Sequence, residues 1–506
     1  MRTSLLTALP TLVFFATICG LPLAQAGLEL VRDEPVQALE VIGPLEAARL
    51  RSFESELLEA SLLQEHLVPG YQAALLELLG RGNEKAIVAR AGWLDYALDV
   101  EHVTGPGILS PGAGGTRALE TLVRFRDTLA ASDIELLLVP VPTKSSVEPR
   151  FLSRDHASPG ADNPDLPEFL QRLEEAGLAV LDLPALLSSE RAAGDPLYLP
   201  RDSHWTPRTM QAVARAVAER AASLCELPAD EQEPCSTRPL AAAGPGDLVG
   251  MLNLPASNAT FSPMALELEQ VVDAEGQVWS PAPDADVLLL GDSFTRVFSD
   301  PDLGLGHGAG FAEHVSLALG RPLDVIALAG GGAAGVRSAL ARRAQGLAGK
   351  RLVIWEFTLR ELSAEPDTWR WIDLPLATAP PAEPEPPLAR SESPLAPDES
   401  STAPARGVTA ELVEVSTLDP DFDYAFCLGI FEYRVLEGEH EGPLWVAFPV
   451  LEEHRPTAAA AFTPGLRHRL VLEPIEDHHD LESTSWIDDT DAGFDIFFPL
   501  EWGPIE

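Results

Sequence analysis

Between Arg117 and about residue 358, short apolar runs alternate with segments in which Ala, Val and Leu recur at helical spacing. The apolar runs occupy residues 134–142, 178–183, 287–290, 323–328 and 351–357. Strands that alternate with helices favour βαβ units and a parallel sheet, whose strands are buried on both faces and therefore read as continuous apolar runs. The pattern predicts an α/β fold with a doubly wound, largely parallel sheet.

The stretch after residue 376 differs in composition from this α/β region. Residues 377–405 are rich in Pro, Ser, Glu and Ala without periodicity, which is typical of a semi-extended linker. Residues 406–506 contain strand-like runs separated by turn residues, which predicts a small C-terminal all-β domain, either a sandwich or a barrel. We therefore expect an α/β domain over residues 27–376, with a helical N-terminal part, then the linker and the β-domain.

Residues 1–26 have the features of an export signal. Arg2 is followed by a long uncharged stretch that ends in the small-residue triplet Ala24-Gln25-Ala26, which favours cleavage before Gly27. The uncharged stretch is also long enough to span a bilayer, so an uncleaved anchor in the inner membrane is the alternative. We expect a periplasmic or secreted protein, or one held at the membrane by this segment.

The charge balance limits the possible partners. The chain has 35 basic and 78 acidic residues, a formal net charge of -43, which excludes nucleic acid because phosphate binding needs a basic surface. Cys225 and Cys235 flank a polar loop, and in an exported protein they are candidates for a disulfide. The acidic segments 476–480 and 488–495 carry metal-type side chains, but such runs are more often solvated loops, so we predict no metal and no cofactor.

The strand at 287–290 ends in the sequence Gly-Asp-Ser-Phe, with Ser293 as the serine. Ligands of parallel sheets bind at the carboxyl ends of the strands, so Ser293 stands where chemistry is expected. A nucleophilic serine needs a base and an acid that orients the base. The alternative is that Ser293 only caps the next helix.

Asp202 and His204 supply such a pair just before a predicted helix. In an extended segment their side chains point to the same side, and a carboxylate beside an imidazole fixes its tautomer and stabilises the imidazolium. Pro207 suits the first turn of the helix that follows. The alternative is that Asp202 or Thr206 caps this helix and His204 is a surface residue.

Four segments together resemble the alginate O-acetyltransferase family of the AlgJ/AlgX type, relatives of the SGNH hydrolases. They are GWLDY (92–96), VPVPTK (139–144), DSHWT (202–206) and GDSF (291–294). The resemblance covers roughly residues 80 to 365 and implies an SGNH-like sheet. The motif order is permuted, because ordinary SGNH esterases place the serine motif first. One departure is Asp95 in GWLDY, where the family leads us to expect Phe.

The resemblance also assigns roles to individual residues. It implies that Ser293 is the nucleophile, His204 the general base and Asp202 the residue that orients it. The Ser293 N–H and the loop Gly330-Gly331-Gly332 are candidates for the oxyanion hole, because glycine permits close approach; the loop is equally readable as a tight turn. Lys144 is a candidate for orienting substrate, or else a solvated surface residue.

We expect an exported polysaccharide O-acetyltransferase that passes acetyl through the serine to a sugar hydroxyl. The donor is an acetylated compound or a membrane-bound acetyl-transfer protein, and the acceptor is a polysaccharide held near the site by the β-domain. One alternative is a carbohydrate acetylesterase with the same triad. Another is a noncatalytic envelope protein that binds glycan or assembly partners. An acidic protein repels a polyuronate, so we expect a neutral glycan or a groove locally lined by Arg.

Overall fold

The computed structural model describes most of the chain between residues 67 and 374 and much of the C-terminal region. The described residues are 20, 23–32, 67–152, 162–191, 195–227, 235–343, 346–364, 366–374, 406–415, 426–437, 443–452, 455–457, 459, 462–474, 485–487 and 496–504. The linker at 377–405, both acidic segments and most of the leader lie outside them. Within the described residues, no helix combines the length and apolar character that a bilayer crossing requires.

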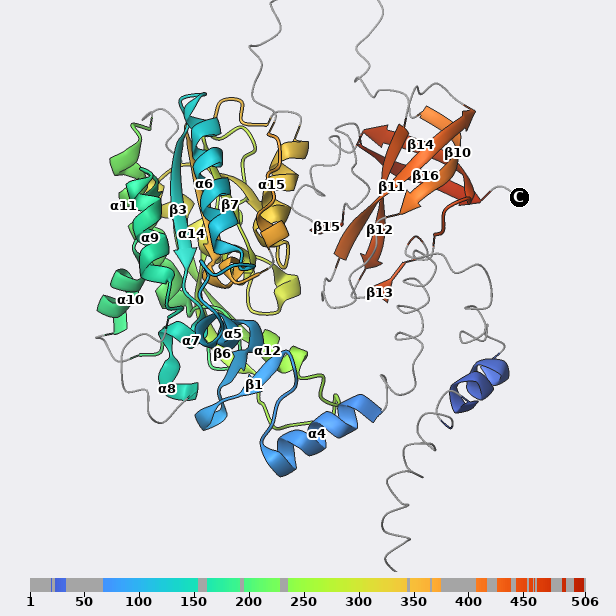
Figure 1. Ribbon diagram of the computed structural model, residues 1–506, viewed down its shortest axis with the longest axis horizontal. Coiled ribbons are helices and arrows are strands. Elements are labelled where there is room, and N and C mark those ends of the chain that lie inside the picture. The colour runs from blue at the N-terminus through green and yellow to red at the C-terminus, as the bar shows by residue number, and fades with distance from the viewer. Residues whose placement is uncertain are drawn as a thin grey trace, which may run out of the picture.

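A five-stranded parallel sheet forms the centre of the α/β domain (Figure 1). Its strands lie in the order β4-β3-β9-β7-β8. Its strands are β3 (Glu135–Val141), β4 (Ala179–Val180), β7 (Val287–Gly291), β8 (Asp324–Ala327) and β9 (Leu352–Thr358). The predicted doubly wound parallel sheet is thereby confirmed. Because β9 lies between β3 and β7, three strands that are distant in sequence end side by side at one edge.

Helices cover both faces of this sheet. One face packs on α10 (Leu183–Arg191), α11 (Pro207–Leu224) and α14 (Phe311–Leu319); the other packs on α6 (Gly115–Ala130), α9 (Leu166–Glu175) and α15 (Gly332–Arg342). Alternate residues of each strand enter the two cores: Leu289 joins the first and Leu290 the second. Burial on both faces explains why the strands are continuously apolar.

Short elements surround the carboxyl ends of the strands. They are α4 (Val68–Leu79), β1 (Ala86–Val88), a 3-10 turn (Arg90–Gly92), β2 (Leu94–Tyr96), α5 (Ala97–Thr104), α7 (Lys144–Val147), α8 (Pro149–Leu152), α12 (Asp247–Met251), α13 (Ser293–Arg296) and further 3-10 turns at Pro301–Leu303, Leu359–Leu362 and Pro366–Trp369. Strands β1 and β2 pair antiparallel, with Ile87 opposite Asp95. The Leu94 N–H donates 2.9 Å to the Pro200 carbonyl, so β2 is tied to the loop that carries Asp202.

An antiparallel pair that the sequence did not predict lies between α11 and β7. Strands β5 (Ser236–Gly244) and β6 (Met264–Val272) pair over nine positions. Their connection contains α12, which contacts β1 and β2. This pair therefore brings α12 to the same end of the sheet as the other short elements.

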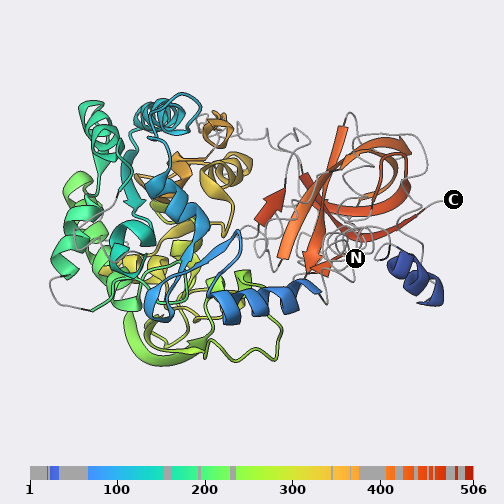
Figure 2. The same ribbon diagram turned by 60° about the horizontal axis from the view of Figure 1, so that its bottom comes forward.

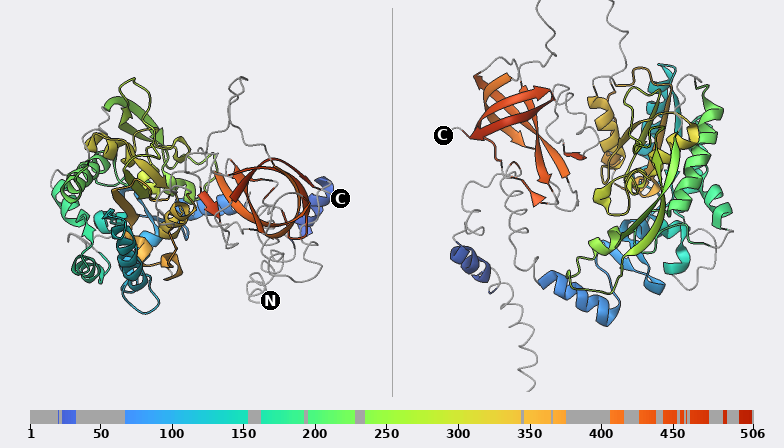
Figure 3. Two further views of the ribbon diagram at one scale, coloured as in Figure 1. Left: turned by 90° about the horizontal axis from the view of Figure 1, so that it is seen from above. Right: turned by 180° about the vertical axis from the view of Figure 1, so that it is seen from behind.

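The C-terminal region forms a separate mixed β-domain, best followed in Figure 2 and in the left view of Figure 3. Its strands are β10 (Arg406–Val415), β11 (Phe426–Glu437), β12 (Pro443–Glu452), β13 (Arg455–Pro456), β14 (Arg467–Pro474), β15 (Ser485–Ile487) and β16 (Ile496–Pro504). Successive pairings of β12, β16, β14, β10 and β11 return to β12, so five strands close into a barrel around Phe431, Tyr433 and Phe448. Of the two predicted β architectures, the barrel is the one formed.

The predicted disulfide is wrong for this structure. Cys225 ends α11 as a free thiol, with its Sγ 3.9 Å from the Arg351 carbonyl. Cys235 comes directly before β5, whose first residue is paired with Val272 of β6. Each cysteine is thus placed by the element beside it, and the two are not joined.

Candidate active site

Ser293 is the first residue of α13 and follows the sharp turn at the carboxyl end of β7. The preceding Asp292 is extended, and its Oδ1 accepts a 2.8 Å hydrogen bond from the Phe294 N–H, so Asp292 rather than Ser293 caps the helix. Only glycine fits at position 291, because a Cβ there would collide with the Thr295 hydroxyl. Ser293 stays partly exposed while Phe294 and Thr295 are buried, which leaves the serine accessible.

A buried pair of carboxyl groups holds this turn against β9. The Glu356 Oε2 accepts from the Asp292 N–H at 3.0 Å and from the Thr295 hydroxyl at 2.9 Å. The Asp292 Oδ2 accepts from the Thr358 N–H at 3.2 Å and from its hydroxyl at 2.6 Å. Burial, and then the charge of Asp292, raise the pKa of Glu356 well above its usual range. A raised pKa favours the protonated form of Glu356, which would fix the turn without two adjacent negative charges.

Asp202 and His204 lie in the loop that leads into α11. Thr206 caps this helix through its side chain and Pro207 occupies the first turn, so neither Asp202 nor His204 is needed as a cap. The Asp202 Oδ1 accepts from His204 Nδ1 at 2.7 Å and from the His204 N–H at 3.0 Å. Both residues are buried, with 1% and 6% of their surface exposed. The structure therefore brings together the two side chains that the sequence paired.

The two members of this pair shift each other's pKa. Burial lowers the pKa of His204, but the charge and hydrogen bond of Asp202 and the charge of Asp247 together raise it above its ordinary value. Burial raises the pKa of Asp202, but the charge and hydrogen bond of His204 and two backbone N–H donors together lower it below its ordinary value, which favours the carboxylate. An imidazolium that forms on His204 is thus stabilised by a fixed negative charge.

The other ring nitrogen of His204 is the one that can act as a base. His204 Nε2 is buried and makes no hydrogen bond to any residue that the structure describes. The ring packs edge-on against Phe294, with centroids 4.7 Å apart, and Phe294 directly follows Ser293. The pair therefore lies beside the serine turn with a vacant acceptor, although no hydrogen bond joins Nε2 to the Ser293 hydroxyl. Such catalytic contacts commonly tighten only when substrate binds.

Lys144 occupies a different place from the one expected of a substrate contact. It is fully buried at the end of β3, and its Nζ donates to three carbonyls: Leu94 at 2.5 Å, Pro200 at 3.1 Å and Asp202 at 2.9 Å. These bonds use all three N–H donors of the ammonium group. We therefore correct the predicted role: Lys144 ties β2 to the loop of Asp202 and does not reach a substrate.

Asp95, the departure from the family pattern, lies beside this lysine. It is 1% exposed and accepts a 3.0 Å hydrogen bond from the Ser145 hydroxyl. Burial raises its pKa to about 7, against the opposing charge of Lys144. A buried carboxyl therefore replaces the expected aromatic side chain behind the site.

The glycine loop follows β8, next to β7. Gly330 and Gly332 have φ of 73° and 56°, a conformation that side chains disfavour. The Gly331 N–H donates to the Leu328 carbonyl at 3.3 Å, whereas Gly332 begins α15, where N–H groups have no partner within the helix. Of the three predicted donors, Gly331 is thus used in the turn, and the N–H groups of Gly330 and Gly332 remain the candidates.

Two charged residues at the site were not singled out by the sequence. Asp247, the first residue of α12, hydrogen-bonds through its backbone N–H to Asp202 at 3.0 Å. Arg360 follows the end of β9, pairs with Asp99 at 3.0 Å and lies 5.3 Å from the centre of the Tyr96 ring. The position of Arg360 after an apolar strand was a usable signal. Asp247 had none, because its contact joins residues 45 apart in the chain.

Asp202, His204 and Asp247 together offer ligand atoms within 4.8 Å of one another. The same atoms take part in hydrogen bonds: His204 Nδ1 with Asp202, and both Asp202 oxygens with N–H donors. A ring nitrogen that donates its proton has no lone pair for an ion, so His204 Nδ1 is used for hydrogen bonding to Asp202.

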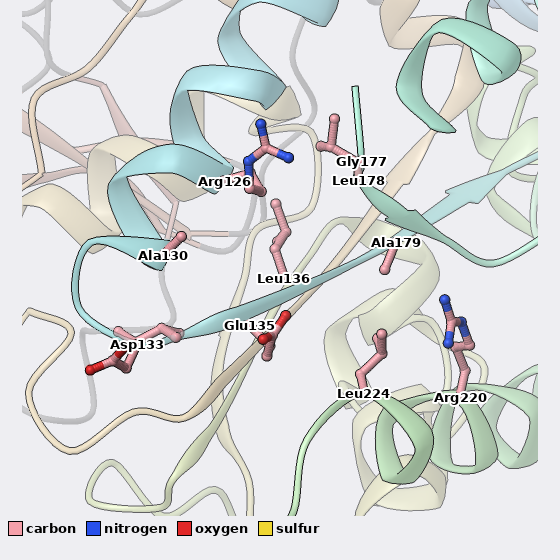
Figure 4. A pocket seen from close by; sticks show the side chains of 11 residues that line it. Arg126, Ala130, Asp133, Glu135, Leu136, Gly177, Leu178, Ala179, Arg220 and Leu224 are labelled. Carbon is pink, nitrogen blue, oxygen red and sulfur yellow. The ribbon is translucent and has the colours of Figure 1, made fainter. Parts of the chain in front are cut away.

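A surface pocket lies at the opposite edge of the sheet, near the amino ends of β3 and β4 (Figure 4). Arg126 of α6, Glu135 of β3 and Arg220 of α11 contribute to its wall. It contains none of the predicted site residues. Since ligands of such sheets bind at the carboxyl ends of the strands, this pocket is separate from the candidate site.

The comparisons with known proteins agree with the sequence resemblance. Residues 87–359 match the family model described as "SGNH hydrolase-like domain, acetyltransferase AlgX". A probable alginate O-acetylase AlgJ of Pseudomonas putida is 28% identical over 232 residues, which are 43% of this chain and 57% of that protein. The chain thus spans just over half the length of this relative.

Solved structures of similar proteins include two from Pseudomonas. The O-acetyltransferase domain of P. putida AlgJ is 24% identical, with a TM-score of 0.44 over 56% of this chain and 93% of that one. P. aeruginosa AlgX is 16% identical, with a TM-score of 0.42 over 74% of this chain and 84% of that one.

Proposed function

The chain belongs to the AlgX/AlgJ family of SGNH hydrolase-like acetyltransferases, and on this premise we propose that it is an exported polysaccharide O-acetyltransferase. The observation that carries the proposal is the Asp202–His204 pair, whose vacant Nε2 lies beside the turn of Ser293. A base held by an ionised acid next to an accessible serine is what nucleophilic acyl transfer requires. The proposed site of action is the periplasm or the cell exterior.

In the first half-reaction, Ser293 Oγ attacks the carbonyl carbon of the donor acetyl group while His204 Nε2 takes the hydroxyl proton. The tetrahedral oxyanion is stabilised by the N–H of Ser293 and by the N–H groups of Gly330 and Gly332. His204 then returns the proton to the leaving oxygen of the donor, which departs. The product is an acetyl ester on Ser293.

In the second half-reaction, a sugar hydroxyl attacks the acetyl-serine. His204 Nε2 accepts the proton of that hydroxyl and passes it to the Ser293 oxygen as the ester bond to the enzyme breaks. Asp202 holds the imidazole through Nδ1 in both halves. Water in place of the sugar would give the esterase reaction, so the acceptor decides between the two activities.

The C-terminal barrel is proposed to hold the polymer near this site. Trp502 supports the idea, since it is 41% exposed on β16 and lies 4.9 Å from the Phe462 ring, and exposed aromatic rings are suited to stacking on sugars. Trp445 is partly buried, and the side chain of Trp486 lies outside the described residues. A tethered polymer would raise the local acceptor concentration without changing the chemistry.

The test is acetyl transfer from a small acetyl ester to candidate oligosaccharides, followed by mass spectrometry. Ser293→Ala should reduce both ester cleavage and glycan acetylation by about 10⁴-fold or more. Ser223→Ala, which changes an exposed serine at the end of α11, is the matched control and should leave both unchanged. Full activity in Ser293→Ala would refute the proposal, and release of acetate without glycan products would favour the esterase.

A further inference from the structure

Asp247 is bonded into the catalytic loop from a separate part of the chain. Its backbone N–H donates to the Asp202 Oδ2 at 3.0 Å. Its side chain accepts from the Ser203 N–H at 2.8 Å and from the Ser203 hydroxyl at 2.5 Å. One residue thus contacts both residues that precede His204, and it orients the Asp202 oxygen that His204 does not use.

The carboxylate of Asp247 also lies close to the imidazole. Its Oδ2 is 3.7 Å from His204 Nδ1, the nitrogen that bonds Asp202 at 2.7 Å. The Ser203 hydroxyl is 3.4 Å from the same nitrogen. His204 therefore has two carboxylates on its Nδ1 side and none hydrogen-bonded to its Nε2 among the described residues.

The backbone before Asp247 is built for this approach. Gly246 has φ of 92°, and a Cβ there would collide with the Arg201 carbonyl. Only glycine allows the two segments to come so close. The contact is thus a defined feature of the fold and not the position of a mobile surface side chain.

We propose that Asp247 is a positioning residue of the catalytic base, which fixes Asp202 and Ser203 and supplies a second negative charge to the imidazolium formed on His204. The inference rests on the proposed acyl transfer and deepens it. It explains why a buried histidine that must accept a proton is placed beside two acids, since each stabilises the charged form.

Several charged groups act on this cluster. Asp202 and Asp247 raise the pKa of His204, while Arg360 lowers it. Burial, followed by the charge of Asp202, raises the pKa of Asp247 to about 6, and His204 opposes this. Lys144 also faces both acids: burial lowers its pKa, and the charges of Asp95, Asp247 and Asp202 oppose this. Above about pH 6, Asp247 is therefore ionised and supports protonation of His204.

The test compares the pH dependence of kcat/KM for cleavage of a small acetyl ester in Asp247→Asn and in the wild-type chain. Asn keeps an acceptor oxygen for Ser203 but removes the charge. The acid limb reports conversion of His204 to its neutral form and should move to lower pH. The plateau of kcat/KM should fall about tenfold, the loss typical when a residue that orients a functional histidine is removed. Ser203→Ala keeps the charge but loses a hydrogen bond that lowers the pKa of Asp247, so its acid limb should move less than that of Asp247→Asn.

Asp273→Asn is the matched control, since this partly exposed aspartate also accepts a backbone N–H, at 2.7 Å from Gln277 in a turn after β6. It should leave the pH profile unchanged. An unshifted acid limb in a folded Asp247→Asn chain would overturn the proposal. If that variant fails to fold, Asp247→Ser serves instead, because it also keeps an oxygen and removes the charge.

A second measurement does not depend on activity. ¹³C-histidine NMR, with the His204 signal assigned through His204→Gln, should show a lower pKa for His204 in Asp247→Asn. An unchanged pKa would also overturn the role of Asp247. A lowered pKa in a protein without acetyl-transfer activity would leave the Asp247 coupling standing and refute only the proposed function.

Discussion

The turn of Ser293 and the loop of His204 each carry a carboxyl group bonded to a second acid from elsewhere in the chain: Asp292 with Glu356 of β9, and Asp202 with Asp247 of α12. In the turn, the Glu356 pKa is raised well above its usual range and the pair is tied to backbone and hydroxyl donors. In the loop, the pKa of Asp247 is about 6, close to neutral pH. The hydrogen bonds that hold the turn thus do not change with pH near neutrality, whereas the charge of Asp247 at the loop does change.

This difference separates two tasks of the site. A nucleophile has to be placed accurately, and buried neutral hydrogen bonds achieve this with little dependence on pH. A general base has to have a suitable pKa, and nearby charges adjust it. Substitutions of the loop carboxyl groups should therefore change rate and pH profile, and substitutions of Glu356 at the turn should mainly change stability.

Among the carboxyl groups, the largest expected effect belongs to Asp202 of the loop. Asp202→Asn removes the charge opposite His204 Nδ1 and favours the wrong tautomer, so kcat should fall by about 10³ to 10⁴-fold. The folded structure should be nearly preserved, because Asn keeps one acceptor oxygen. Steady-state kinetics together with thermal unfolding measure the two effects, and a variant with near-normal kcat would break the comparison.

The turn should respond in stability. Glu356→Ala leaves the Asp292 N–H and the Thr295 hydroxyl without their acceptor and should cost about 2–4 kcal/mol of unfolding free energy. Denaturant unfolding is the measurement. A loss below about 0.5 kcal/mol, within the range of ordinary surface substitutions, would mean that this carboxyl does not support the turn.

A third prediction concerns pH and the buried Asp95. Its pKa of about 7 in the folded chain exceeds the unfolded value of 3.8, so its contribution to stability is present below about pH 4 and lost as the pH rises to 7. In Asp95→Asn, the unfolding free energy should no longer fall by up to about 4 kcal/mol between pH 4 and pH 7. Unfolding free energies at pH 4 and 7 give the slope, and equal slopes in both chains would show that Asp95 is ionised in the folded state.

The smallest expected effect sharpens the contrast. Glu356→Gln replaces a protonated carboxyl with a neutral group of the same shape, so stability at pH 7 should change by less than about 1 kcal/mol. Activity should also be close to that of the wild type. A large loss in either would indicate that Glu356 is ionised, and the two carboxyl pairs would then be alike.

The sequence predicted the elements that follow strong patterns. Five apolar runs became the parallel sheet, and Asp202 and His204 were paired because extended residues two apart face the same side. Strand β5 was missed because Pro239 and the Ala-rich run after it do not resemble a strand, although a two-stranded edge tolerates proline. Its partner β6 lies beyond a connection that contains α12, so no local hairpin signal was present.

The rest of the site depends on contacts that no local pattern encodes. Asp247 reaches Asp202 across 45 residues through a glycine conformation that is visible only in the folded chain. A lone lysine in the sequence is typical of the surface. Lys144 can be buried because carbonyl oxygens from distant segments accept hydrogen bonds from its ammonium group. The Cys225–Cys235 disulfide followed from the cysteines' positions around a loop, whereas the structure does not join them.

The central claim is that Ser293 carries the acetyl group between donor and acceptor. Intact-mass spectrometry of the chain, quenched shortly after mixing with a small acetyl ester, measures this directly. The account predicts a gain of one acetyl group, mapped to the peptide that contains Ser293 and absent from Ser293→Ala. Turnover of the ester with no acetyl on Ser293, or with acetyl on Ser293→Ala at another residue, would contradict it.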